Sequence, residues 1–153
     1  LMKFTQTCTI TADCDTVWDF LMHMENVASC LKGVEAMQRI DDDNYEGTLR
    51  VKVGPVSLTF QGIVQVEVRD RDQRHGVIRA EAKDAKRGGS VRARMNLDLV
   101  AKNPTETEMH VILETHILGK IGEFGQPLIR KKTDTMLQEF AAQVSKQLLA
   151  QQS

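Results

Sequence analysis

Hydrophobic and polar residues alternate along most of the first 120 positions of the chain. The clearest segment is 56–69, where the even positions from Val56 to Val68 are apolar or glycine and the odd positions are mostly polar. A period of two over this length predicts a strand with one dry and one wet face. Similar patterns lie at 3–11, 34–40, 45–53, 75–83, 91–100 and 108–117. The pattern therefore predicts seven strands.

Two short helices are expected between the first and second strands. Asp13 is suited to cap a helix, and Val17, Trp18 and Leu21 follow it at helical spacing. Positions 26–31 allow a second short helix.

A long amphipathic helix is predicted after the last strand, because the apolar positions change to steps of three and four residues from Ile121 to Leu148. Pro127 does not fit a helix interior. The helix is therefore either kinked near Glu123 or begins with Pro127 in its first turn.

The order of these elements predicts an α+β fold, in which a seven-stranded curved antiparallel sheet is wrapped around the long C-terminal helix. Several positions on the inward face of the sheet are too small to reach a helix. These positions are Gly47, Gly62, Ala80, Ala82 and Ala93. We therefore expect an apolar cavity that binds apolar molecules.

The length of 153 residues fits one domain, which we place at 2–153. Lys and Arg total 20 against 21 Asp and Glu, and aromatic residues make up only 5%. This balance disfavours nucleic acid as a partner, because nucleic-acid sites need basic surfaces or stacked aromatic rings.

The three cysteines, Cys8, Cys14 and Cys30, form no C-x-x-C pair, and the histidines are scattered. We expect no metal, no cofactor and no catalytic centre. The absence of a visible signal peptide or an apolar run of membrane-spanning length predicts a cytoplasmic protein. A peripheral position at the inner face of the membrane is left open.

Four stretches of the chain resemble the G-subunit family of carbon monoxide dehydrogenase. They are VWDFL at 17–21, CLKGVE at 30–35, VKVGPVSLTFQG at 51–62 and GKIGEFG at 119–125. That family is part of the helix-grip (SRPBCC) superfamily, together with birch-pollen-allergen-like, START-like lipid-transfer and polyketide-cyclase domains. The resemblance implies the helix-grip fold. It implies function less directly, because one fold hosts several activities.

Ten inward-facing residues are candidates for the cavity wall. They are Phe20, Leu58, Phe60, Met95, Leu113, Thr115, Phe124, Leu128, Met136 and Phe140. Each could equally be plain core, because core and cavity wall share the same face of the sheet.

A cavity mouth is expected at the end of the sheet where most glycines gather, because glycine lets the backbone bend and open. The candidate mouth residues are Leu31, Lys32, Gly33, Gly54, Pro55, Lys86, Arg87 and Gly119. Together with Asp84 in the loop 84–89, they give a modestly basic rim that suits an acidic partner or lipid headgroups. The alternative is that these glycines only form tight turns.

The favoured function is a non-catalytic carrier or binding module for an apolar small molecule, such as a quinone-like or isoprenoid lipid. The resemblance implies that it serves a redox enzyme such as a carbon monoxide dehydrogenase-type molybdenum hydroxylase. One alternative is an assembly or scaffold factor for that enzyme. Another is a polyketide-cyclase-like enzyme, which would need a polar dyad that the inward positions do not supply. The oligomeric state is left open.

Overall fold

The computed structural model describes residues 1–151 and contains one seven-stranded antiparallel sheet. Its strands lie in the order β1-β7-β6-β5-β4-β3-β2. Their bounds are Met2–Ile10 (β1), Val34–Arg39 (β2), Asn44–Val53 (β3), Val56–Asp70 (β4), His75–Asp84 (β5), Gly89–Asn103 (β6) and Glu106–Gly119 (β7). The predicted seven-stranded antiparallel sheet is confirmed, and its six consecutive strands from β2 to β7 form a meander.

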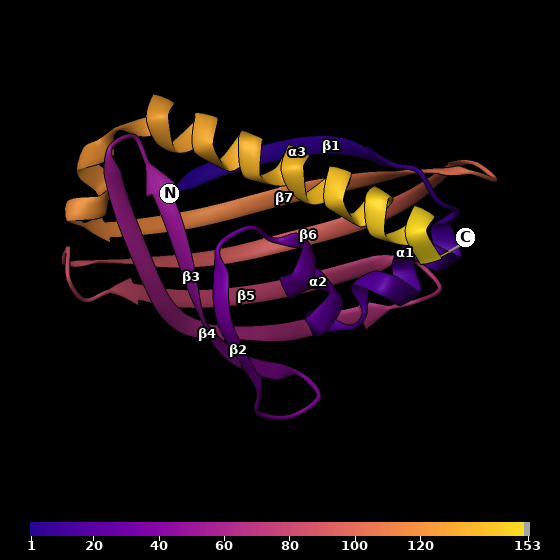
Figure 1. Cartoon of the computed structure of the whole chain (residues 1–153), viewed down its shortest axis with the longest axis horizontal. Helices are drawn as coiled ribbons and strands as arrows, with labels where there is room; N and C mark the ends of the chain where they lie inside the picture. The colour runs from indigo at the N-terminus through magenta and orange to yellow at the C-terminus, as the bar shows by residue number, and fades with distance from the viewer. Residues whose placement is uncertain (152–153) are drawn as a thin grey trace.

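The helices complete the predicted helix-grip fold. Helices α1 (Cys14–Leu21) and α2 (Met24–Cys30) connect the two edge strands, β1 and β2. The short 3-10 helix η1 (Lys120–Phe124) leads into α3 (Gln126–Gln151), which lies across the concave face of the sheet (Figure 1). At about 1.5 Å per residue, α3 is roughly 39 Å long and spans the sheet from end to end.

The start of α3 resolves the two alternatives for Pro127. Gly125 has a positive φ of 83° and separates η1 from α3, so the chain turns there instead of continuing as a kinked helix. Pro127 lies in the first turn of α3, where its missing N–H has no intrahelical partner to lose.

The core is divided into two clusters that lie at opposite ends of α3. The first joins Trp18 of α1 to Val144 and Leu148 of α3 and to the adjoining parts of β1, β6 and β7. The second joins Val53 and Leu58 of the β3–β4 hairpin to Ile121 of η1. The sheet and the helix are therefore packed together at both ends, whereas the space between the two clusters is not filled.

Asp84 is a buried structural residue rather than part of an exposed loop. It ends β5, is only 2% exposed, and accepts hydrogen bonds from the backbone N–H groups of Thr59 (2.9 Å) and Arg87 (2.8 Å). The hydrogen bond from the Arg87 N–H is the main reason that the pKa of Asp84 lies below its ordinary value. Asp84 thus links β4 to the β5–β6 turn.

We expect Asp84→Asn to lower the free energy of unfolding by about 1–3 kcal/mol at neutral pH, because a buried N–H loses its acceptor. The native pKa is lowered, so the carboxylate stabilises the fold above its unfolded-state pKa, and this contribution is lost as the pH falls through the native pKa. The variant should therefore lose less stability than the wild type between pH 7 and about pH 3. Urea unfolding at both pH values measures this.

Asp72→Asn, in the exposed turn between β4 and β5, is the matched control. A neutral-pH loss no larger than that of the control would show that Asp84 is not a structural hydrogen-bond acceptor.

Candidate functional site: a cavity between the sheet and α3

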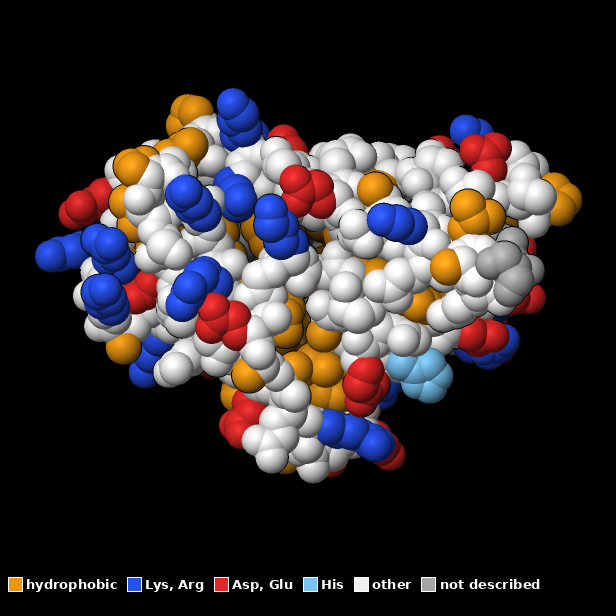
Figure 2. Space-filling model, viewed as in Figure 1, with side chains coloured by type: hydrophobic (Ala, Val, Ile, Leu, Met, Phe, Trp, Pro, Cys, Tyr) orange, Lys and Arg blue, Asp and Glu red, His pale blue; other side chains and the backbone are white. Residues whose placement is uncertain are grey.

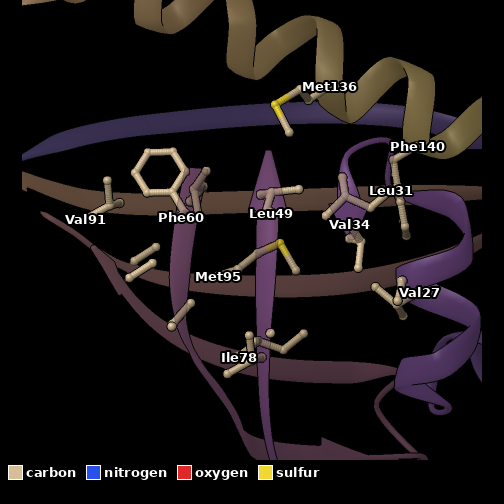
Figure 3. Close-up of a pocket in the computed structure, with 18 of the residues that line it drawn as sticks. Val27, Leu31, Val34, Leu49, Phe60, Ile78, Val91, Met95, Met136 and Phe140 are labelled. Atoms are coloured by element: carbon tan, nitrogen blue, oxygen red, sulfur yellow. The ribbon is translucent and has the colours of Figure 1, made fainter. Parts of the chain in front are cut away.

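A cavity of about 520 Å³ lies between the concave face of the sheet and α3, and α2 and β2 border it on one side (Figure 3). This volume falls in the range of about 300–1,000 Å³ that is usual for small-molecule sites. The cavity occupies the space between the two core clusters.

The hollow follows from two rows of small residues that cross neighbouring strands. In one row Gly47, Gly62 and Ala82 lie opposite one another on β3, β4 and β5. In the other, Ala80 and Ala93 are paired on β5 and β6, and Thr115 of β7 continues the row. Paired residues face the same side of a sheet, so both rows lie below α3 without reaching it. All five small residues expected at the inward face line the cavity.

Gly62 is constrained as well as small. A Cβ atom at this position would collide with the backbone oxygen of Glu81 and would lie 2.7 Å from the Ala82 Cβ. Strands β4 and β5 approach each other too closely for any side chain there. The hollow at Gly62 is therefore part of how these strands pair.

Larger apolar side chains form the wall around these rows. Phe60, Leu49 and Met95 project from the sheet, and Met136 and Phe140 project from α3 into the same space (Figure 3). On α3 the wall positions Ile129, Lys132, Thr133, Met136, Leu137 and Phe140 recur at three- and four-residue spacing, so one face of the helix covers the cavity.

Of the four hydroxyl-bearing residues that border the cavity in residues 1–151, three donate hydrogen bonds to the backbone, and the fourth, Thr48, is paired with the exposed Gln61 in an outward-facing row of the sheet. The Tyr45 hydroxyl donates to the Asp42 carbonyl oxygen (3.4 Å), and Thr115 Oγ1 donates to that of Met2 (3.3 Å). Thr133 Oγ1 donates to the carbonyl oxygen of Ile129 (2.9 Å). The hydroxyl hydrogens of these three residues are therefore engaged, and the interior offers a ligand mainly apolar contact.

Eight of the ten candidate wall residues line the cavity. They are Leu58, Phe60, Met95, Leu113, Thr115, Phe124, Met136 and Phe140. The structure places the other two elsewhere. Phe20 is 5% exposed and belongs to the core cluster around Trp18. Leu128 is 38% exposed, because the cavity face of α3 begins one position later, at Ile129.

Of the eight candidate mouth residues, only Leu31 borders the cavity. The seven others lie outside its wall, namely Lys32, Gly33, Gly54, Pro55, Lys86, Arg87 and Gly119. Val53, Leu58 and Ile121, which adjoin these turns in sequence, are buried and close the cavity at that end.

The wall formed by α2 and β2 was not predicted from the sequence. Val27, Val34, Ala36 and Met37 line the cavity there, and Figure 2 shows hydrophobic side chains exposed in a hollow between α2 and the β2–β3 hairpin. Strict alternation along β2 predicts Gln38 at the inner face. A register shift between Val34 and Ala36 places Met37 opposite Gly47 instead, and Gln38 is exposed. No residue in the sequence signals this bulge.

Across residues 1–151, no group of three or more His, Cys, Asp or Glu side chains is arranged to hold a metal ion. Within the same range, the residues that line the cavity include no His and no Cys.

Solved structures share this architecture at low sequence identity. A conserved protein from Geobacillus kaustophilus superposes with a TM-score of 0.89 and 18% identity, covering 97% of this chain and 96% of that one. A norcoclaurine synthase point mutant from Thalictrum flavum superposes with a TM-score of 0.72 and 15% identity, covering 99% of this chain and 96% of that one. A START superfamily protein from Mycobacterium smegmatis superposes with a TM-score of 0.64 and 14% identity, covering 95% of each chain. At these identities the likeness concerns the fold.

The curved sheet, the gripped helix and the cavity define the helix-grip fold, which these solved structures share. The family model for CoxG, the G-subunit of carbon monoxide dehydrogenase, matches residues 7–149. The chain therefore belongs to the CoxG family. No curated protein sequence matches it.

We expect Ala93→Leu to fill part of the cavity, because Ala93 lies in the middle of a row of small residues. The affinity for the neutral apolar dye Nile red should fall by about tenfold or more, which corresponds to about 1.4 kcal/mol. The thermal midpoint should stay the same or rise, since the added carbons occupy empty space instead of a packed core. Ala101→Leu, at an exposed position of the same strand, should change neither quantity. Unchanged dye binding in Ala93→Leu would place the dye outside this cavity.

Proposed function

We propose that the protein is a non-catalytic carrier or binding module for an apolar small molecule held between the sheet and α3. The observation that supports this most directly is the wall itself, in which apolar side chains surround about 520 Å³ and the hydroxyls of Tyr45, Thr115 and Thr133 are already hydrogen-bonded. An apolar ligand gains contact there without leaving its own polar groups unpaired. A quinone-like or isoprenoid lipid is the ligand class that we favour.

The family match supports a redox enzyme as the partner to which this protein supplies its ligand. CoxG is described as the G-subunit of carbon monoxide dehydrogenase. We propose that this chain holds its ligand for an enzyme of that kind, a molybdenum hydroxylase. A role as an assembly or scaffold factor would use the outer surface and would not depend on the cavity, so cavity variants separate the two roles.

A catalytic role is the third candidate, since norcoclaurine synthase shares the fold. Acid–base catalysis in this cavity would need an imidazole or carboxyl group aimed at the ligand. Glu46 and Glu81 contribute to the wall, but both lie in the same cross-strand row as Ile63, which is 52% exposed on the outer face. Their carboxylates therefore point away from the ligand. This arrangement favours binding over catalysis.

We propose that the protein acts in the cytoplasm and meets its enzyme or a membrane surface transiently. In residues 1–151 no helix has both the length and the apolar character needed to cross a membrane.

The proposal is tested by mass spectrometry of the organic extract of purified protein, followed by rebinding to delipidated protein. We expect an apolar molecule near one equivalent and uptake of a short-tailed quinone. Leu113→Trp should lower both, because the indole would occupy cavity space next to Met95.

The matched control is Ile112→Trp, one residue away on the opposite face of β7 and 37% exposed in the wild type. No extracted ligand and no uptake of quinone or Nile red would overturn the carrier proposal. Normal activity of the partner enzyme with Leu113→Trp, despite lost ligand binding, would favour the scaffold role.

A further inference from the structure

In the described part of the chain, residues 1–151, four charged residues border the cavity: Glu46, Arg69, Glu81 and Lys132. Glu46 and Glu81 lie on the outer face of the sheet, as shown above, and Glu81 also pairs with Arg92 at 3.4 Å. The two acidic residues therefore contribute backbone to the wall and no charge to its interior.

Arg69 is neutralised by the turn between β2 and β3. Its guanidinium forms an ion pair with Asp43 and donates a hydrogen bond to the Asp42 carbonyl oxygen at 2.8 Å. The positive charge of Arg69 is therefore already paired within the protein and is not available to a ligand.

Lys132 is the remaining charge, and its environment differs from that of Arg69. It lies on the cavity face of α3, one turn before Met136 and two turns before Phe140, and it is half-buried. Within residues 1–151 no acidic side chain forms an ion pair with it. A lysine in such a place lines the apolar wall with its methylene groups and holds its ammonium at the rim.

The surrounding surface favours an anion at this rim. Lys131 on α3 and Arg50 and Lys52 on β3 are exposed, whereas Arg130 is directed to β1, where it donates a hydrogen bond to the Lys3 carbonyl oxygen and lies over the Phe4 ring. Figure 2 shows Lys and Arg side chains gathered over the part of the face that β3 and the N-terminal half of α3 occupy. Arg50 is paired with Glu35, and Asp134 lies on the same turn of α3, so the positive charge is partly offset but not cancelled.

We propose that the Lys132 ammonium binds the anionic head, a carboxylate or phosphate, of an amphiphile whose hydrocarbon part occupies the cavity. This inference rests on the carrier function proposed above and narrows its ligand class to lipids with an acidic head group, whereas an uncharged quinone would be held by its apolar part alone. The hydroxyls of Tyr45, Thr115 and Thr133 are engaged with the backbone, and Thr48 lies in an outward-facing row. The interior therefore offers no free donor for a charged group, so the head lies at the rim and the tail lies along Met136 and Phe140. The charge-assisted hydrogen bond holds the ligand in one orientation.

The test compares three ligands with the same chain and different heads: dodecanoate, dodecyl phosphate and dodecanol. Each displaces Nile red from delipidated protein. We expect one or both anions to bind about tenfold more tightly than the alcohol. The ratio of anion to alcohol affinity should fall as salt is added, because the ammonium lies at the solvent edge. Which anion binds more tightly distinguishes a carboxylate ligand from a phosphate ligand.

Lys132→Met keeps the aliphatic wall and should bring the anion-to-alcohol ratio close to one, whereas Lys132→Arg should retain most of it. Lys131→Met, one position along the helix and exposed, removes the same charge from the general basic surface and is the control that should lower the ratio far less than Lys132→Met. The ratio is compared within each variant, so a change in dye affinity does not affect it.

A wild type that binds Nile red but shows no anion preference would overturn this inference and leave the carrier function standing. A preference that persists in Lys132→Met would also overturn it, and would assign the head group to other basic residues of the rim. A wild type that binds neither the dye nor any of the three ligands would overturn the carrier function, and this inference would fail with it.

Discussion

A single helix is too narrow to cover the concave face of a seven-stranded sheet, and the rest of the structure follows from this mismatch. Adjacent strands are about 4.8 Å apart, so seven span roughly 29 Å, whereas a helix with its side chains is about 10–12 Å wide. Side chains fill the space between the sheet and α3 at the two ends of the helix. At one end α1 packs there, and at the other end η1 and the β3–β4 hairpin do. Between these ends, small residues leave the space open.

The packed ends and the open middle have separate energetic roles. Fully buried residues such as Trp18, Val144 and Leu58 belong to the two end clusters, so most of the apolar burial that stabilises the helix against the sheet lies there. Side chains around an empty space lack contact partners on one side and forgo part of their dispersion energy. A ligand of the right shape restores these contacts and stabilises the folded state in proportion to its occupancy. The fold can therefore be stable when empty and more stable when loaded.

Alternation and helical spacing were enough to predict the strands, the long helix and the hollow beneath it, because each follows from side-chain size at a given face. Two of the errors arise because a shift of one residue along a helix or strand changes which face a side chain lies on. Leu128 lies one position before the cavity face of α3, and the bulge in β2 moves Gln38 outward. Asp84 shows a third reason why the sequence did not predict every role, because an aspartate in an exposed turn and an aspartate that is a buried hydrogen-bond acceptor have the same sequence pattern. The composition of the wall was therefore predictable and its exact membership was not.

The position of Lys132 fits the physics of a charge beside an apolar cavity. An ammonium deep inside would lose its hydration, and it would need a permanent acidic partner that would also repel an anionic ligand. At the rim, its methylene groups extend the wall while the ammonium stays hydrated until an anion replaces the water. Arg69, at another part of the same wall, shows the contrasting arrangement, in which a charge is held by its own ion pair with Asp43. Among residues 1–151 the cavity wall thus has one engaged cation, Arg69, and one unengaged cation, Lys132. The unengaged one gives an asymmetric, tail-inward ligand a preferred orientation.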